Sequence, residues 1–421
     1  MGGAAGAMAL IDPLSRLYEA ELEEQSRRIK SLSPEAAATD EDFWGWVQQS
    51  YTVSPNIINL NNGGVSPQPK MVQDAMIRYY QYSNEAPSYY MWSVLDEGRE
   101  QVRRDLARLA GCMPEEVAIN RNSTEALDTI IMGIPLTAGD EVIISKQDYP
   151  NMINAWKYRE KRDGVKLVWQ NFNLPIENEE ELISGYTSMF SEKTKVVHLI
   201  HIVNWMGQIM PVKKIIEAAH ARGIEVVLDG AHSFAHFDYN LADLNPDYFG
   251  TSLHKWLCAP FGSGMLYVKK EKIAKLMPLF PGPDPTLDDI KKFEHLGTRS
   301  FPIEMAIGAA IRFHDVIGSE RKEARLFYLK NYWAEKAAEI PGVKVHTSLK
   351  KGYSCAISLF SIEGMKPNEI REQLMKKYQI HSVAIEWENI KGVRITPNVY
   401  TTLTDLDKLV KAIRDMANTP K

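Results

Sequence analysis

The sequence predicts an α/β protein: a large domain with a mostly parallel seven-stranded sheet covered by helices, and a smaller C-terminal α+β domain. Three observations support this fold class. Short β-branched runs alternate with amphipathic helical patterns from about residue 115 onward. The runs are almost continuously apolar, which is typical of strands covered by helices on both faces. After the proline-rich stretch Pro281–Pro285, the pattern changes to a long helical region followed by mixed strands and helices.

The N-terminal part is expected to be helical. Pro13–Ser54 shows helical periodicity with several helix-start signals. A turn-rich loop follows at Asn61–Pro69, and two amphipathic helices follow at Pro69–Tyr82 and Val94–Ala110. We expect residues 1–60 to form a helical segment that packs near the small domain.

The expected large domain spans residues 61–283. Its predicted strands are Val117–Ile119, Glu141–Ser145, Lys166–Trp169, Lys195–Ile202, Ile224–Leu228 and Gly264–Val268. Helical patterns between them are Ser123–Met132, Met152–Asp163 and Val212–Arg222. Because ligands bind at the carboxyl ends of the strands in such sheets, polar residues that follow these strands are candidates for a functional site.

The expected small domain spans residues 284–421. A long helical region, Ile303–Ala338, leads into it. Its other predicted elements are strands at Val343–His346, Ala356–Ser361, His381–Ile385 and Gly392–Ile395, and helices at Pro367–Tyr378 and Leu403–Met416.

Composition and charge exclude several classes of protein. The chain has 421 residues, enough for two to three domain-sized units, and 44% of them are hydrophobic, as in a globular protein with a large core. The net charge of −5 and the even spread of Lys and Arg indicate no nucleic-acid partner and no attraction to anionic membranes. No apolar run of about 18 residues exists, so no transmembrane helix is expected.

The first ten residues bear on the location of the protein. Met1–Leu10 is small, weakly apolar and uncharged, and it lacks the basic start of a complete signal peptide. We therefore expect a cytoplasmic protein. The alternative is a periplasmic protein in which these residues are the remainder of a truncated export signal.

An acid and a lysine suggest the chemistry. Asp229 ends a buried-strand pattern in V-L-D-G-A-H, and Lys255 lies 26 residues later in G-T-S-L-H-K-W. An acid that keeps a ring nitrogen protonated and a lysine that bonds to an aldehyde are what pyridoxal 5'-phosphate requires. Gly230 and Ala231 would permit close approach of a flat ring. A surface lysine is the alternative, but apolar neighbours on both sides of Lys255 argue against it.

The same cofactor needs a phosphate site and a group that stacks on its ring. Asn122–Ala126 reads N-S-T-E-A after a predicted strand, so Ser123 and Thr124 would offer hydroxyls at a helix N-terminus. A plain capping box explains that motif equally well. Ser252 and His254 could add side-chain donors. Two further residues follow strands: Tyr149, which could stack on the ring, and Asn204.

Metal binding, nucleotide binding and serine-hydrolase chemistry are not indicated. His232 and His236 have a spacing of four residues, but they have no HExxH glutamate and no clear third ligand. Cys112, Cys258 and Cys355 are far apart in sequence and form no CxxC pair, so we expect structural roles for them. The chain has no GxSxG elbow, no GxxxxGK[ST] loop and no GxGxxG motif after a strand.

These residues resemble the class V aminotransferase family, a branch of the fold type I pyridoxal-phosphate enzymes. The resemblance covers Asn61–Met416 and depends on the D-G-A-H and S-L-H-K motifs at their spacing. Within the family, three segments look most like the isopenicillin N epimerase-like group: N-N-G-G-V-S-P-Q-P, N-E-A-P at Asn84–Pro87, and G-T-R at Gly297–Arg299.

The resemblance implies a role for each candidate. Lys255 carries the cofactor, Asp229 holds its ring nitrogen, and His232 lies near the ring or its 3-oxygen. Arg394, in G-V-R-I-T-P, matches the arginine that binds a substrate carboxylate, a task that suits a guanidinium. The other implied roles are phosphate binding by Thr124, Ser252, His254 and the Ser123 backbone, ring stacking by Tyr149, and a place near the substrate for Asn204.

The resemblance also implies a homodimer with shared active sites. Thr298 matches a residue that reaches the phosphate bound by the neighbouring subunit. The side-chain pocket for the substrate would be lined by Asn62–Val65, by the aromatic segment Tyr89–Trp92 and by loops of that subunit. The aromatic segment would serve equally well as core of the dimer interface.

The expected reaction occurs at the α carbon of an amino acid. Epimerisation and transamination are the main alternatives, because both begin with removal of the α proton. The family's desulfurases place a nucleophilic cysteine before the carboxylate-binding arginine, but His381–Lys391 contains no cysteine. A cysteine-independent C–S or C–Se lyase is the third alternative. A catalytically silent relative that acts as a binding protein is the non-enzymatic one.

Overall fold

The structure is a computed structural model that describes Glu24 and residues 27–418. The candidate export-signal remainder, Met1–Leu10, lies outside the described residues, as does much of the first half of the predicted helical stretch Pro13–Ser54. Residues 27–30 are helical, and two further helices follow in the described part of that stretch, α2 (Pro34–Ala38) and α3 (Glu41–Gln49). Each begins at a side-chain cap, Ser33 for α2 and Asp40 for α3.

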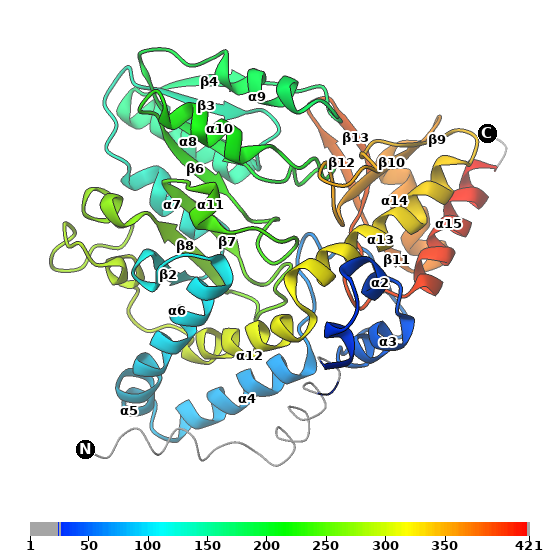
Figure 1. Cartoon of the computed structure of the whole chain (residues 1–421), viewed down its shortest axis with the longest axis horizontal. Coiled ribbons are helices and arrows are strands. Elements are labelled where there is room, and N and C mark those ends of the chain that lie inside the picture. Colours follow the sequence, from blue (N-terminus) through cyan, green and yellow to red (C-terminus); the bar gives the residue numbers. More distant parts are fainter. Residues whose placement is uncertain (1–23, 25–26, 419–421) are drawn as a thin grey trace.

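The largest sheet has seven strands in the order β2-β8-β7-β6-β5-β3-β4 (Figure 1). Neighbouring strands from β7 to β4 are parallel, and β8 is antiparallel to both of its neighbours. The predicted α/β class with a mostly parallel sheet is therefore confirmed. The strands are β2 (Val117–Asn120), β3 (Glu141–Ser145), β4 (Lys166–Gln170), β5 (Thr194–Ile200), β6 (Glu225–Asp229), β7 (Tyr248–Ser252) and β8 (Gly264–Val268).

Helices cover both faces of this sheet, which explains why most residues of its inner strands are buried and apolar. Alternate residues of β3 point to opposite faces: Ile143 joins one buried cluster, whereas Val142 and Ile144 join the other. On one face lie α7 (Ser123–Gly133) and α8 (Pro150–Asp163). On the other lie α4 (Lys70–Glu85), α6 (Asp96–Ala110), α9 (Glu179–Thr187), α10 (Val212–His220), α11 (Leu241–Leu244) and α12 (Phe301–Ile317).

The long helical region expected at Ile303–Ala338 consists of two helices. Gly318 separates α12 from α13 (Ser319–Ala338) and has a φ of 82°, which L side chains rarely adopt. α12 packs against α4 and α6 beside the large sheet, whereas α13 contacts α2 and α15 (Leu403–Ala417). Because the chain turns at Gly318, α12 packs beside the large sheet and α13 packs beside the small sheet.

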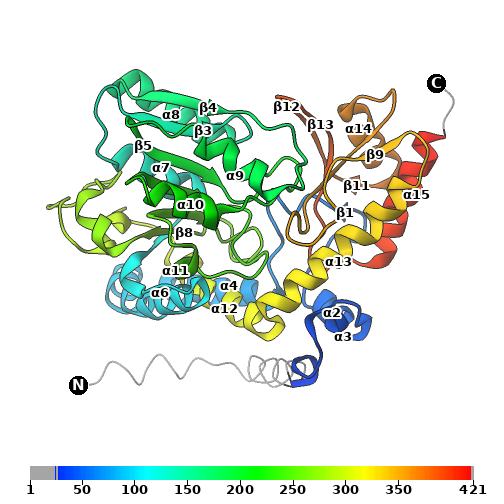
Figure 2. The ribbon, with the colours of Figure 1, turned by 45° about the horizontal axis from the view of Figure 1, so that its top comes forward.

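A second sheet is antiparallel and has the order β12-β13-β10-β9. α13, α15 and α14 (Pro367–Tyr378) pack with it around a core that includes Trp333 and Phe360 (Figure 2). This is the smaller α+β unit that the sequence predicts; the residue limits of the domains stay a prediction. The strands are β9 (Val343–Val345), β10 (Ser358–Ile362), β12 (Val383–Trp387) and β13 (Ile390–Ile395).

A short pair of parallel strands joins the segment before the large sheet to the C-terminal part of the chain. β1 (Ile58–Asn59) pairs with β11 (Ile380–His381), and an isolated bridge joins Asn61 to Thr396. The segment that precedes the large sheet is thereby held against the small antiparallel sheet. In the described part of the chain, no helix is long and apolar enough to span a membrane.

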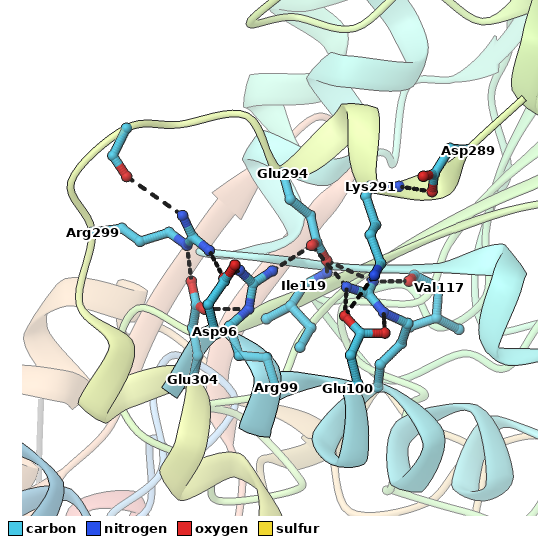
Figure 3. A network of polar contacts seen from close by, with 12 residues as sticks. Asp96, Arg99, Glu100, Val117, Ile119, Asp289, Lys291, Glu294, Arg299 and Glu304 are labelled. Carbon is cyan, nitrogen blue, oxygen red and sulfur yellow. Dashed lines mark hydrogen bonds and ion pairs between the residues drawn. The ribbon is translucent and has the colours of Figure 1, made fainter. Parts of the chain in front are cut away.

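A buried ion network ties α6 to the segment before α12 (Figure 3). Glu294 accepts hydrogen bonds from Arg99, from Arg103 at 2.7 and 2.8 Å, and from the Ile119 backbone at 2.6 Å. Glu304 pairs with Arg99 at 2.8 Å and with Arg299 at 3.0 Å. The side chains of Arg99, Arg103 and Glu294 are only 4%, 3% and 6% exposed, so the cations and acids compensate one another away from water.

Candidate active site

One cavity of about 330 Å³ brings the predicted site residues together. It lies at the carboxyl ends of β5, β6 and β7, as expected for a sheet of this type, and β12 and β13 close its other side. The predicted residues that line it are Ser123, Thr124, Tyr149, Asn204, Asp229, His232, Ser252, His254, Lys255 and Arg394.

Lys255 follows β7, and its amine lies 3.2 Å from Nε2 of His232. Burial lowers the pKa of Lys255 to about 8; the nearby Arg394 lowers it further and Asp229 opposes the shift. The lowered pKa gives the Lys255 amine a larger neutral fraction near neutral pH than an ordinary lysine has. Only the neutral amine is a nucleophile or a base, so this lysine can act in either role.

Asp229 ends β6, is 4% exposed, and accepts a hydrogen bond from the Ala231 N–H at 2.9 Å. Burial raises its pKa, although Ala231 and Lys255 act against that shift. Gly230 was expected to permit close approach of a flat ring, but the structure gives another reason for a glycine at this position. A Cβ there would lie 1.9 Å from the Phe249 ring. The glycine therefore permits packing against β7, and Ala231 is the residue that lines the cavity.

His232 is held in its neutral form. Burial lowers its pKa well below the usual value, and the charges of Lys255 and Arg394 add to that effect. His236 holds the backbone of the turn that carries His232. Its Nδ1 lies 2.7 Å from the His232 carbonyl, and its ring stacks on Trp256 with the ring centres 3.8 Å apart. Nδ1 of His232 has no hydrogen-bond partner in the described chain and is available to a ligand.

The expected phosphate cup lies at the N-terminus of α7. Asn122 is the N-cap and accepts from the Glu125 N–H at 2.9 Å, so Ser123 and Thr124 are not needed for capping. The Ser252 hydroxyl lies 2.9 Å from both the backbone N–H and the hydroxyl of Ser123. Two hydroxyls, a helix N-terminus and His254 thus converge at one end of the cavity, an arrangement that suits a phosphate.

Arg394 occupies the opposite side, on β13. Its guanidinium is buried and donates to the Asn204 carbonyl at 2.8 Å and to Oδ1 of Asn61 at 3.1 Å. No carboxylate pairs with it among the described residues, and burial lowers its pKa to about 10. Its Nε and the Asn204 Oδ1 are buried without hydrogen-bond partners in the described chain. A buried cation with unused donors fits a carboxylate ligand.

Tyr149 and Thr298 differ in their placement. Tyr149 precedes α8, lines the cavity and is 42% exposed, so its ring can cover a flat ligand from the open side. Thr298 does not line the cavity; it lies exposed on the loop before α12. The role implied for Thr298 involves a second subunit, and this placement within one chain leaves that role a prediction.

Several lining residues were missed by the sequence reasoning. Gly63 and Gly64 belong to the expected pocket segment Asn62–Val65, but Trp205, Val383 and Ile385 were not anticipated. Trp205 directly follows Asn204, which is the one signal that could have found it. In contrast, Tyr89 and Trp92 are 61% and 45% exposed and do not line the cavity of this chain.

Comparison with known proteins identifies the family. The profile of the aminotransferase class-V family matches residues 58–409, most of the chain. The chain belongs to the class-V aminotransferase family. An isopenicillin N epimerase from Amycolatopsis lactamdurans is 26% identical over 395 residues, which cover 89% of this chain and 98% of the relative. A probable cysteine desulfurase from Halalkalibacterium halodurans is 27% identical over 393 residues, which cover 87% and 94%.

Solved structures agree on the fold of this class-V aminotransferase family member. The cystine C–S lyase C-DES, in complex with its product cysteine persulfide, superposes with a TM-score of 0.78 at 20% identity, covering 86% of this chain and 98% of that one. The apo cysteine desulfurase of Thermococcus onnurineus superposes with a TM-score of 0.79 at 22% identity, covering 90% and 98%.

The family membership supports the predicted cofactor, pyridoxal 5'-phosphate. The residues present fit it. A buried carboxylate at Asp229 requires a cationic partner, which a protonated ring nitrogen supplies. The unpartnered Nδ1 of His232 and the hydroxyl cluster of Ser123 and Ser252 offer polar groups at the ring side and at the phosphate side.

Proposed function

We propose that this protein is a pyridoxal-phosphate enzyme that acts at the α carbon of an amino acid, as an epimerase or racemase. One observation carries the assignment to the α carbon. The buried guanidinium of Arg394, which has no carboxylate partner among the described residues, lines the same cavity as the amine of Lys255. A cation that holds a carboxylate and an amine that accepts a proton are the two groups that α-proton removal requires from the protein.

The lining residues that take part in the proposed reaction have distinct roles. Arg394 and Asn204 bind and orient the substrate carboxylate. When bound, pyridoxal phosphate supplies an electron sink that stabilises negative charge at the substrate's α carbon. Asp229 keeps the ring nitrogen protonated, and the neutral Lys255 amine takes the α proton. Epimerisation needs a second proton-transfer group on the other side of the α carbon, and the candidates are Tyr149 and His232, both of which line the cavity.

Two other reactions use the same first step. Transamination would return the proton to the cofactor, and a cysteine-independent C–S or C–Se lyase would expel a side-chain group. Desulfuration through a protein persulfide is disfavoured, since no cysteine lines the cavity. Cys258 and Cys355 are buried and Cys112 is half-buried, and burial raises the pKa of Cys112 to about 12. The non-enzymatic alternative is a catalytically silent family member that acts as a binding protein.

We also propose a homodimer with shared active sites and a cytoplasmic location. The exposed loop that carries Thr298 would reach the phosphate bound by a second copy. Cross-linking of a cysteine placed at Thr298 to the other copy would test the arrangement, and a monomer in sedimentation experiments would contradict it.

The proposal is tested in two steps. First, the purified protein is loaded with pyridoxal phosphate and reduced with borohydride. Peptide mass spectrometry should find the cofactor on Lys255, Lys255→Ala should lose it, and Lys275→Ala, at an exposed lysine, should retain it. Second, amino acids are incubated with the enzyme in D2O.

Deuterium at the α carbon with growth of the opposite stereoisomer supports an epimerase. Formation of a keto acid would assign a transaminase, and release of a thiol or selenol product would assign a lyase. A loaded protein that exchanges no α proton from any amino acid would favour the binding protein.

A further inference from the structure

An apolar wall lies beside the carboxylate-binding arginine. Trp205, Val383 and Ile385 line the same cavity as Arg394 and come from two elements, the loop after β5 and strand β12. Ile385 is 3% exposed, and Trp205 and Val383 are half-buried. The part of Trp205 and Val383 that stays exposed faces a cavity that can hold a ligand.

The wall is rigid. The Trp205 indole N–H donates to the Gln147 carbonyl at 2.9 Å, and the Trp387 indole N–H donates to the Lys146 carbonyl at 2.8 Å. The two indoles stack with their centres 5.2 Å apart and their planes 21° apart. Because both N–H groups are satisfied by backbone oxygens, Trp205 has no donor left for a polar ligand and presents apolar ring surface.

The position of the wall is set relative to the substrate's carboxylate. Val383 is the register partner of Arg394 in the β12–β13 hairpin, and Arg394 donates to the carbonyl of Asn204, the residue before Trp205. An amino acid whose carboxylate is bound by Arg394 therefore has this wall within reach of its side chain.

Charged groups near the wall are few. Among the described lining residues, the carboxylates and cations are Asp229, Lys255 and Arg394, and all three have partners in the proposed reaction. The two lining histidines, His232 and His254, have pKa values lowered first of all by burial and stay neutral near pH 7. A second charge on the substrate would find no counterion from this chain, and burying it unpaired is costly.

We propose that the substrate is an α-amino acid with a large, uncharged, apolar side chain, which packs against the wall of Trp205, Val383 and Ile385. This inference rests on the proposed function, since it assumes that Arg394 binds the substrate's carboxylate. It adds the substrate class, and it names three specificity-determining residues that have no part in the proton transfer.

The test is a panel of amino acids in D2O with the cofactor-loaded enzyme, in which α-deuterium incorporation gives kcat/KM. From alanine through norvaline to norleucine, kcat/KM should rise roughly fourfold per methylene, the gain expected for burying each one. Methionine and leucine should exceed glutamate and aspartate by on the order of 100-fold. Aspartate or glutamate exchanging as fast as leucine would overturn the inference and leave α-proton removal intact. No exchange with any amino acid would instead refute the proposed function.

Two variants locate the effect on the wall. Val383→Lys places a cation beside the side chain, so the ratio of kcat/KM for glutamate over norleucine should rise by roughly tenfold or more. Ala384→Lys is the matched control, because the next residue of β12 faces the other side of the sheet and does not line the cavity. Retention of the bound-cofactor absorbance shows that both variants are folded. An unchanged ratio in a folded Val383→Lys enzyme would contradict the assignment.

Discussion

Nη2 of Arg394 donates a hydrogen bond to Oδ1 of Asn61 at 3.1 Å, although the two residues are 333 positions apart in the chain. Asn61 opens the N-N-G-G loop, and its amide nitrogen also lies 3.2 Å from Nε2 of His381. The guanidinium is therefore held from one side by Asn61 and from the other by the Asn204 carbonyl. Asn61 acts through Arg394 and is a positioning residue for the substrate carboxylate.

Replacing Asn61 should affect substrate binding more than turnover. Asn61→Ala leaves Arg394 with one fewer acceptor, and we expect KM to rise by roughly fivefold, about 1 kcal/mol, with kcat within twofold. Steady-state kinetics against Asn56→Ala, a change at an exposed asparagine, measures the difference. An equal loss in kcat would show that Asn61 has a role in the chemical step instead.

Removal of the arginine itself should be more severe. Arg394→Ala eliminates a charge-assisted contact, so KM for amino acids should rise by about 1.5–3 kcal/mol, or more than tenfold. The corresponding amino-acid amides lack the carboxylate and should be processed almost equally by both enzymes. Kinetics on an acid and its amide check this, and a parallel loss on both would mean that Arg394 does not bind the carboxylate.

The pH dependence of stability should reveal the lowered pKa of Lys330, a buried lysine outside the cavity. Lys330 on α13 is 0% exposed and donates to the Ser348 carbonyl and the Ser354 hydroxyl, both at 2.9 Å. Burial lowers its pKa from 10.5 to about 8. Between these pH values the unfolded chain holds a proton that the folded chain has lost, so the free energy of unfolding rises with pH.

Lys330→Met should remove this contribution. The slope of unfolding free energy between pH 8 and pH 10.5 should fall by up to about 1.4 kcal/mol per pH unit relative to the unmodified chain. Urea unfolding at several pH values measures the slope, and Lys408→Met, at an exposed position on α15, should leave it unchanged. Identical slopes for the two variants would refute the lowered pKa.

The ion network of Figure 3 should be sensitive to loss of its central acid. Glu294→Gln leaves Arg99 and Arg103 buried without their shared carboxylate, and we expect a loss of about 3–5 kcal/mol in the free energy of unfolding. Asp315→Asn is the control, because its pair with Arg108 is 39% and 54% exposed and should contribute less than about 1 kcal/mol. Denaturant unfolding of both variants compares them directly.

Strands of the large sheet are the part of the fold that the sequence predicts best. Glu141–Ser145 and Gly264–Val268 have the predicted limits, since continuous apolar runs between turns leave little choice of boundary. β7 was not among the strands singled out, because its sequence, Y-F-G-T-S, ends in small and polar residues. The division at Gly318 was also missed, since the apolar periodicity continues on both sides of that glycine.

The candidate site was predictable where residues act through their own chemistry. Lys255 and Asp229 have few alternatives as partners for a pyridine aldehyde, and both line the cavity. Val383, Ile385 and Asn61 are common residue types whose importance depends on how distant segments meet. No local pattern contains the pairing of β12 with β13 or the bridge between Asn61 and Thr396.

The contact between Asn61 and Arg394 has a consequence for how the protein is made. Every cavity residue on the proposed cofactor side, from Ser123 to Lys255, is synthesised before the hairpin that carries Arg394. Asn61, in contrast, leaves the ribosome early, and more than 330 further residues are synthesised before its partner Arg394 is present. A nascent chain can therefore form the cofactor side of the cavity first, and it can form the carboxylate-binding side only near the end of translation.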